Sequence, residues 1–144
     1  MKAFLDTTVL VASVVQQHPH HARAMSVIRR LLQGKDEGHI AAHGLAESYA
    51  VLTTLPVTPR IGPETAQKLI EENFLTRFAV VALTAREYSR LVSELAERGI
   101  LGGATYDAIQ ILCAKKAGAE RVYTFNVEHF RRLAGELADN VVAP

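Results

Sequence analysis

Short apolar segments alternate with stretches of helical periodicity along the whole of this 144-residue chain. Lys2 to Leu5 and Phe78 to Leu83 are two of the apolar segments, and each has the length of a buried strand. Helical patterns follow them, from Thr7 to about Val15 and from Ala85 to Arg98. Because strands that alternate with helices favour parallel pairing, the sequence predicts a three-layer α/β/α fold of Rossmann-like type with a short central, mostly parallel sheet.

The other expected elements continue this alternation. Gly34 and Gly118 mark the ends of two helices, and Thr84 is of a type that favours the N-cap of the helix starting at Ala85. The further helices are expected at 18–33, 44–55, 64–75, 105–117 and 127–133, and the further strands at 38–42, 121–125 and 141–142.

Length and composition favour a single domain over residues 1–144. Hydrophobic residues make up 49% of the chain, which is enough for one core, and no internal repeat divides it. The formal net charge is only +1, from 16 Lys and Arg against 15 Asp and Glu. Any contact with a nucleic acid therefore has to come from a local basic patch.

The N-terminal segment and the cysteine content favour a cytoplasmic protein without a membrane anchor. The segment MKAFLDTTVLVASVV has the charge-then-apolar order of a signal peptide, but Asp6 and two threonines interrupt it. No apolar run approaches the roughly 20 residues that cross a bilayer. Cys113 is the single cysteine, so it forms neither an intramolecular disulfide nor a cysteine-rich zinc site.

Four side chains able to bind a metal ion interrupt the apolar patterns: Asp6, Glu47, Asp107 and Asn126. Asp6 and Asn126 each follow an expected strand, at the sheet edge where ligands bind in open α/β folds. Glu47 and Asp107 lie on apolar helical stripes. A buried carboxylate costs roughly several kcal/mol unless a positive group meets it. The four together predict a site for an oxygen-preferring ion such as Mg²⁺ or Mn²⁺.

Each of these residues also has a structural interpretation, which the residue patterns alone leave open. Asp and Asn are favoured N-caps, and an acid such as Asp107 suits the first turn of a helix. The Glu47 carboxylate could extend outward from the edge of its stripe. The run His18, His20 and His21 lacks matching Cys or carboxylate spacing, so it more simply begins a helix.

Four segments together resemble the PIN domain, and most of all the VapC-type toxin ribonucleases of bacterial toxin-antitoxin pairs. They are LDTTVL, LAESYAVLTTLP, GATYDAIQ and VYTFNVEHF, and the resemblance covers essentially the whole chain. By position, Asp6, Glu47 and Asp107 correspond to the three metal-binding acids of that family. The resemblance implies a metal-dependent endoribonuclease that cuts RNA phosphodiesters with a metal-activated water.

The chain departs from the family pattern near its C-terminus. Where many members carry T-x-D-x-x-D-F with a fourth carboxylate, this chain has Thr124, Asn126 and His129. The side-chain carbonyl of Asn126 could coordinate an ion or hold a water, but one fewer negative charge weakens the binding of a second ion. The resemblance leaves open whether one or two ions act.

The resemblance also implies partners. Proteins of this type are expected to bind a small cognate antitoxin across the active groove and to pair as homodimers. Arg29, Arg30 and Lys35, or Arg131 and Arg132, are the candidate residues for gripping RNA phosphates.

Two rival functions remain at this point. A non-catalytic binding module could use the same acids to receive a basic partner peptide. A Rossmann-like phosphatase is less well supported, because the Asp6 region reads DTT and lacks the second nearby Asp of a D-x-D motif.

Overall fold

The computed structural model describes residues 1–144 and is built around a sheet of five strands that all pair in parallel. In spatial order the strands are β3, β2, β1, β4 and β5, so β1 lies at the centre. This arrangement confirms the predicted α/β class and parallel pairing. The strands are β1 (Lys2–Leu5), β2 (Glu37–Ala41), β3 (Ala79–Val81), β4 (Arg121–Tyr123) and β5 (Val141–Val142).

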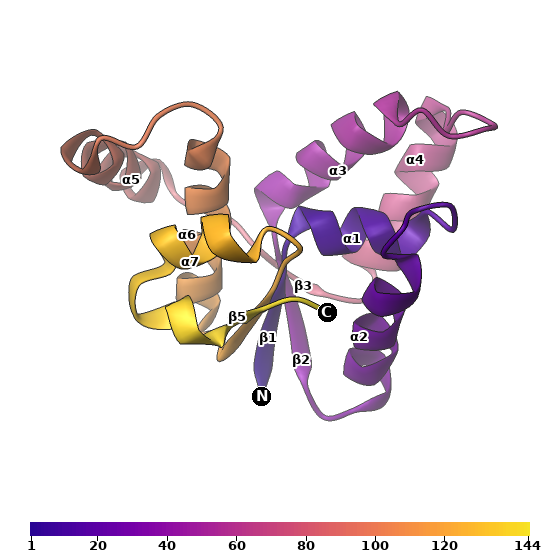
Figure 1. Ribbon diagram of the computed structural model, residues 1–144, viewed down its shortest axis with the longest axis horizontal. Helices are drawn as coiled ribbons and strands as arrows, with labels where there is room; N and C mark the ends of the chain where they lie inside the picture. The colour runs from indigo at the N-terminus through magenta and orange to yellow at the C-terminus, as the bar shows by residue number, and fades with distance from the viewer.

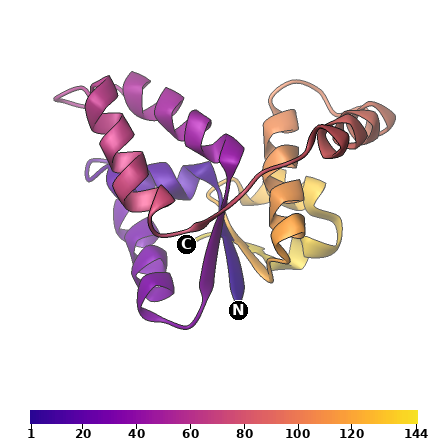
Figure 2. The same cartoon turned by 180° about the vertical axis from the view of Figure 1, so that it is seen from behind.

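Seven helices cover the two faces of the sheet (Figures 1 and 2). Helices α1 to α4 lie on one side of the strands and α5 to α7 lie on the other, which gives three layers. A π-helical segment, Glu71–Leu75, continues α4, and a 3₁₀ segment, Gly135–Asn140, follows α7. The helices are α1 (Thr7–Val14), α2 (His21–Gln33), α3 (Ala42–Thr54), α4 (Pro63–Ile70), α5 (Ala85–Arg98), α6 (Ala104–Ala117) and α7 (Val127–Ala134).

The central strand divides the hydrophobic core into two parts, because successive side chains of a strand point to opposite faces. Ala3 and Leu5 pack into the cluster formed with α1, α2 and α4. Phe4 packs into the cluster formed with α5, α6 and α7. All three side chains are completely buried, which holds the carboxyl end of β1 rigidly between the two helical layers.

Several expected elements differ from the structure. The strand expected over 121–125 ends at Tyr123, and the helix expected over 64–75 is α-helical only to Ile70 and then π-helical. Helix α2 begins at His21 rather than His18, because the residues before it form a turn in which the His20 amide donates to His18 Nδ1. The strand expected over Phe78 to Leu83 is only three residues long, and it lies at the edge of the sheet with Val80 40% exposed. An apolar run alone does not distinguish an edge strand from a central one.

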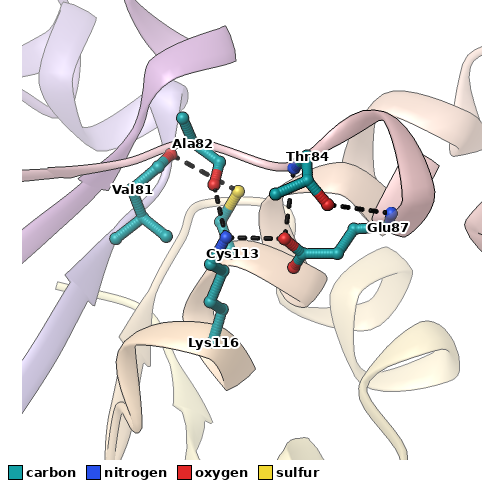
Figure 3. Close-up of polar contacts among 6 residues, drawn as sticks. All are labelled: Val81, Ala82, Thr84, Glu87, Cys113 and Lys116. Carbon is teal, nitrogen blue, oxygen red and sulfur yellow. Dashed lines mark hydrogen bonds and ion pairs between the residues drawn. The ribbon is translucent and has the colours of Figure 1, made fainter.

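A group of polar contacts joins the end of β3 and the start of α5 to α6 (Figure 3). Lys116 Nζ donates to the Ala82 carbonyl at 2.8 Å and pairs with Glu87 Oε1 at 2.6 Å. Glu87 also forms a capping box with Thr84, which confirms Thr84 as the predicted N-cap of α5. The network therefore anchors one end of α5 to the helix that carries Asp107.

Cys113 is buried beside this network, and its thiol donates to the Val81 carbonyl at 3.7 Å (Figure 3). Burial raises the pKa of the thiol to about 11, so it stays protonated and unreactive near neutral pH. None of the helices has the length and apolar character that crossing a bilayer demands.

Candidate active site

Asp6 lies at the junction of β1 and α1, where it serves both as a helix cap and as a buried acid. Its backbone is extended, and its backbone N–H donates at 3.0 Å to the carbonyl of Tyr123, the last residue of the partner strand β4. Its Oδ2 accepts from the Thr8 amide at 3.4 Å, the Thr8 hydroxyl at 2.7 Å and the Thr124 hydroxyl at 2.8 Å. All these bonds fall on Oδ2, so Oδ1 is left for a ligand.

The electrostatics of Asp6 place the three predicted acids near one another. Burial raises the pKa of Asp6 to about 6, although the hydrogen bonds from Thr8 and Thr124 act to lower it. The negative charges of Glu47 and Asp107 raise it further. We call Asp6, Glu47 and Asp107 the acidic cluster. It draws together residues from three separate parts of the chain at the carboxyl edge of the sheet.

Glu47 reaches the acidic cluster from α3. Its side chain is 36% exposed, and Oε2 lies 3.3 Å from Nε2 of His43 one turn earlier. That oxygen is buried yet has no well-aligned hydrogen bond, so the His43 contact satisfies it only in part. An outward-extending carboxylate would have a fully solvated tip, so the structure favours an inward-facing acid.

Asp107 reaches the acidic cluster from the first turn of α6. Burial raises its pKa, the charge of Glu47 raises it further, and His129 on α7 acts in the opposite direction. Asp6, Glu47 and Asp107 place three negative charges close together in fully or partly buried positions, which is unfavourable. A bound cation would relieve the repulsion between them.

Asn126 lies at the N-cap of α7 but is less closely tied to the acids. Asn126 is exposed, and its side chain makes no capping hydrogen bond, while its backbone N–H donates to Thr124 Oγ1 at 3.0 Å. Asn126 and His129 line a further cavity of about 280 Å³. A ligand role for Asn126 stays a prediction. On α7, His129 is the residue whose charge acts on the Asp107 carboxyl.

A second set of residues supports the acids, and the sequence only partly revealed it. Gln110 is 1% exposed, and its Nε2 donates to Thr7 Oγ1 at 3.0 Å, which joins α6 to α1. Gly44 packs against this pair, since a Cβ there would lie 3.3 Å from Thr7 Oγ1. Thr124 is completely buried and bonds Asp6 directly. Gln110 lies one helical turn after Asp107, but no spacing along the chain identifies Thr7 as its partner.

An aromatic pair connects α3 and α6 next to the acidic cluster. The rings of His43 and Tyr106 stack with centroids 5.3 Å apart and an interplanar angle of 3°. His43 also contacts Glu47, and Tyr106 directly precedes Asp107. Sequence reasoning missed this pair, because the two residues come from distant segments.

Two cavities flank the acidic cluster. One of about 600 Å³ is lined by Asp107 together with Arg98, His129 and Arg132. The other, of about 270 Å³, is lined by Glu47 and by residues that include His18, His20 and Phe125. His20 stacks on Phe125 with ring centroids 4.5 Å apart. His18 and His20 thus lie near Glu47, in the turn that precedes α2, and His21 is the first residue of that helix.

The basic residues predicted to grip phosphates are not all near the acids. Arg29 and Arg30 line a separate cavity on α2. Lys35 precedes β2 and so lies at the opposite edge of the sheet. Arg131 donates to the Val141 carbonyl, and of the predicted residues only Arg132 shares a cavity with a site acid.

The donor set suits a hard divalent cation, although no three His, Cys, Asp or Glu side chains lie close enough to hold an ion directly. Mg²⁺ commonly binds through one or two carboxylates and keeps several of its waters. Asp6 Oδ1, which accepts no hydrogen bond from the chain, and the Asp107 carboxylate are oxygen donors of that kind. The residues therefore fit an ion bound partly through water.

The chain belongs to the PIN domain family, whose sequence model matches residues 3–136. Ribonuclease VapC40 of Mycobacterium tuberculosis is 38% identical over 115 residues, which are 80% of this chain and 80% of that protein. Ribonuclease VapC27 of the same organism is 35% identical over 116 residues, which are 81% of this chain and 79% of that protein.

Solved structures share the fold at lower sequence identity. The chain is similar to VapBC2 from Rickettsia felis, solved bound to a promoter DNA fragment, with a TM-score of 0.67, 21% identity and coverage of 100% and 98% of the two chains. It is also similar to Mycobacterium tuberculosis VapC20, described as a sarcin-ricin loop cleaving toxin, with a TM-score of 0.67, 19% identity and coverage of 88% and 92%. At these identities the likeness concerns the fold.

Proposed function

We propose that this chain is a metal-dependent endoribonuclease that acts as the toxin of a type II toxin-antitoxin pair. The observation that carries the proposal is the convergence of three carboxylates, from β1, α3 and α6, at one edge of the sheet. Membership of the PIN domain family and the relatives named as ribonucleases support it. We assign the proposed catalytic activity to a single domain over residues 1–144.

In this proposal the acidic cluster holds Mg²⁺ or Mn²⁺, which when bound supplies an activated water and neutralises charge on the phosphodiester. Asp6 presents Oδ1, because Thr8 and Thr124 already donate to Oδ2. Asp107 offers a second carboxylate from α6, and Glu47 a third from α3. Because the three do not lie close enough to hold one ion directly, at least one of them would act through a water on the ion.

The remaining polar residues position these acids or the substrate. Gln110 ties α6 to Thr7 at the start of α1, which keeps Asp107 and Asp6 in register. Asn126 offers a neutral oxygen at the rim for a water or for the substrate. Because Asn126 adds no negative charge, the proposed site is better suited to one tightly bound ion than to two.

The proposed partners are an RNA substrate, a small cognate antitoxin and a second copy of the chain, in the cytoplasm. Solved structures of VapBC and FitAB proteins share the fold of this chain, and they support an antitoxin partner. An antitoxin residue such as Arg or Lys would pair with the acidic cluster, because burial and the repulsion between the acids, which raise the pKa values of Asp6 and Asp107, make a neighbouring positive charge favourable.

The test is cleavage of total cellular RNA by purified protein, free of any antitoxin, with Mg²⁺ or Mn²⁺ and with EDTA. We expect discrete fragments only with metal, and none from Asp107→Asn, which removes one charge at nearly constant shape. Asp139→Asn is the matched control, because Asp139 is exposed in the 3₁₀ segment far from the acids in sequence, and it should cut normally.

Circular dichroism should find both variants folded. An unfolded Asp107→Asn would mark a structural acid. No cleavage by folded, metal-loaded protein would favour instead a non-catalytic module whose acidic cluster receives a basic peptide.

A further inference from the structure

We propose that the cavity beside Asp107 binds the RNA strand next to the bond that is cut, with its phosphates contacting Arg98 and Arg132. We call this cavity, of about 600 Å³, the basic cavity. The inference rests on the proposed ribonuclease function and adds the path of the substrate to it.

A site with three neighbouring carboxylates needs positive charge elsewhere to bind RNA. The acidic cluster repels phosphates wherever a metal ion does not neutralise it, and the net charge of +1 supplies no general attraction. Binding of single-stranded RNA by a protein of this kind depends on a local groove of cations that follows the backbone. The cations have to share a continuous surface with the acids.

The basic cavity meets this requirement. Asp107 is the one acid in its lining, where Arg98, His129 and Arg132 provide three basic groups. The cavity beside Glu47 has neither Lys nor Arg in its lining. The cavity at Arg29 and Arg30 contains no acid of the site. Of these three cavities, only the basic cavity combines a site carboxylate with arginines.

The arginines of the basic cavity are free to bind a ligand. Arg132 is exposed and its guanidinium makes no hydrogen bond within the chain, whereas that of Arg131 donates to the Val141 carbonyl at 2.9 and 3.2 Å. One nitrogen of Arg98 donates to the Arg132 carbonyl at 3.2 Å, which leaves its other N–H groups available. The hydrogen bond from Arg98 also joins the end of α5 to α7, so Arg98 and Arg132 lie side by side in the lining of the basic cavity.

The rest of the lining suits the less polar parts of a nucleotide. Leu101 is 83% exposed, more than any other large hydrophobic side chain of the chain, and with Ile100 it forms part of an apolar wall. Gly102 and Gly103 follow it, and Gly102 has a φ of 57°, which a side chain would strain. A ribose or base packs on this wall while its phosphate meets the arginines.

The experiment measures binding of a short, fluorescein-labelled single-stranded RNA of mixed sequence by fluorescence anisotropy, over a series of salt concentrations with Mg²⁺ present. The background variant is Glu47→Gln, which prevents cleavage from the other side of the acidic cluster and leaves the basic cavity intact. Arg132→Gln carries the test, since it breaks no bond within the chain. Arg90→Gln is the matched control, because Arg90 is exposed on α5 and makes no hydrogen bond or ion pair.

We expect Arg132→Gln to weaken RNA binding about tenfold. The slope of log affinity against log salt should fall by about 0.7, the value for one phosphate contact on a single strand. The Arg98→Gln, Arg132→Gln double variant should lose about twice that slope, and Arg132→Lys should restore the slope while recovering only part of the affinity. Arg90→Gln should match its parent.

Binding by the parent with an unchanged slope in Arg132→Gln would overturn the inference and leave the ribonuclease function standing. Equal losses in Arg132→Gln and Arg90→Gln would also overturn it, because the effect would then be one of overall charge. No RNA binding by the parent, together with no cleavage of total RNA by the unaltered chain, would overturn both proposals.

Discussion

Replacing Asp6 by Asn should stabilise the metal-free protein at neutral pH. The folded state raises the pKa of Asp6 from its ordinary value of 3.8 to about 6, chiefly by burial. At about 1.4 kcal/mol for each pKa unit, this difference costs the folded state about 3 kcal/mol once the carboxyl is ionised. An amide carries no such cost, although the rearranged hydrogen bonds to Thr8 and Thr124 subtract about 1 kcal/mol from the gain.

The sign of the pH dependence follows from proton linkage. The folded state holds the Asp6 proton more tightly than the unfolded state does, so unfolding releases a proton between about pH 4 and about pH 6. Ionisation of Asp6 therefore lowers the free energy of unfolding least below about pH 4. This destabilisation of the folded state increases as the pH rises and levels off above about pH 6.

The assay is urea denaturation in EDTA, followed by circular dichroism across this pH range for the unaltered chain and Asp6→Asn. The difference between the two proteins cancels the titrating groups that do not interact with Asp6. It should grow by about 2 kcal/mol between about pH 4 and about pH 7. Adding Mg²⁺ should stabilise the unaltered chain more than the variant. A difference that is constant over this range would refute the reasoning, and so would a variant that loses stability relative to the unaltered chain as the pH rises.

Three further predictions test the surroundings of the site. Thr124→Val should lower the free energy of unfolding by about 1 to 3 kcal/mol in urea denaturation, because it removes the bond to Asp6 Oδ2 and leaves the Asn126 amide without its acceptor. Tyr106→Ala should cost about 0.5 to 1.5 kcal/mol through the loss of stacking on His43, and Tyr106→Phe should cost almost nothing; equal costs would show that the stacking is unimportant. Cys113 should resist iodoacetamide near neutral pH in the native protein and react fully in urea, as followed by mass spectrometry, and rapid native labelling would contradict its burial.

Much of the fold follows from local patterns in the sequence. The apolar segments expected at 2–5 and 121–125 became the parallel strands β1 and β4, the second ending at Tyr123, and the N-cap Thr84 and the left-handed Gly118 lie where the helix signals placed them. These features depend on residues that are neighbours in the sequence, so they can be predicted from the sequence alone. The exposed edge position of β3 cannot be predicted in this way, because it depends on which strands lie beside β3 in the sheet.

The sequence indicated the acids as a set, since each one alone also suits a structural role as a helix cap, in a first helical turn or at the edge of an apolar stripe. Their mutual arrangement depends on tertiary structure, because α3 and α6 bring Glu47 and Asp107 to the end of β1 across long stretches of chain. Asp6 is both helix cap and buried acid, so the two interpretations of it are compatible.

The sequence by itself determined the types of element, their order and the residues able to bind a metal ion, because periodicity and residue chemistry are local properties. Only the tertiary structure decided which side chains share a cavity. Arg98 and Arg132 lie 34 residues apart, yet a hydrogen bond joins them at the wall of the basic cavity, while the adjacent Arg131 is held by the Val141 carbonyl. Long-range packing sets such distances, and no spacing along the chain encodes them.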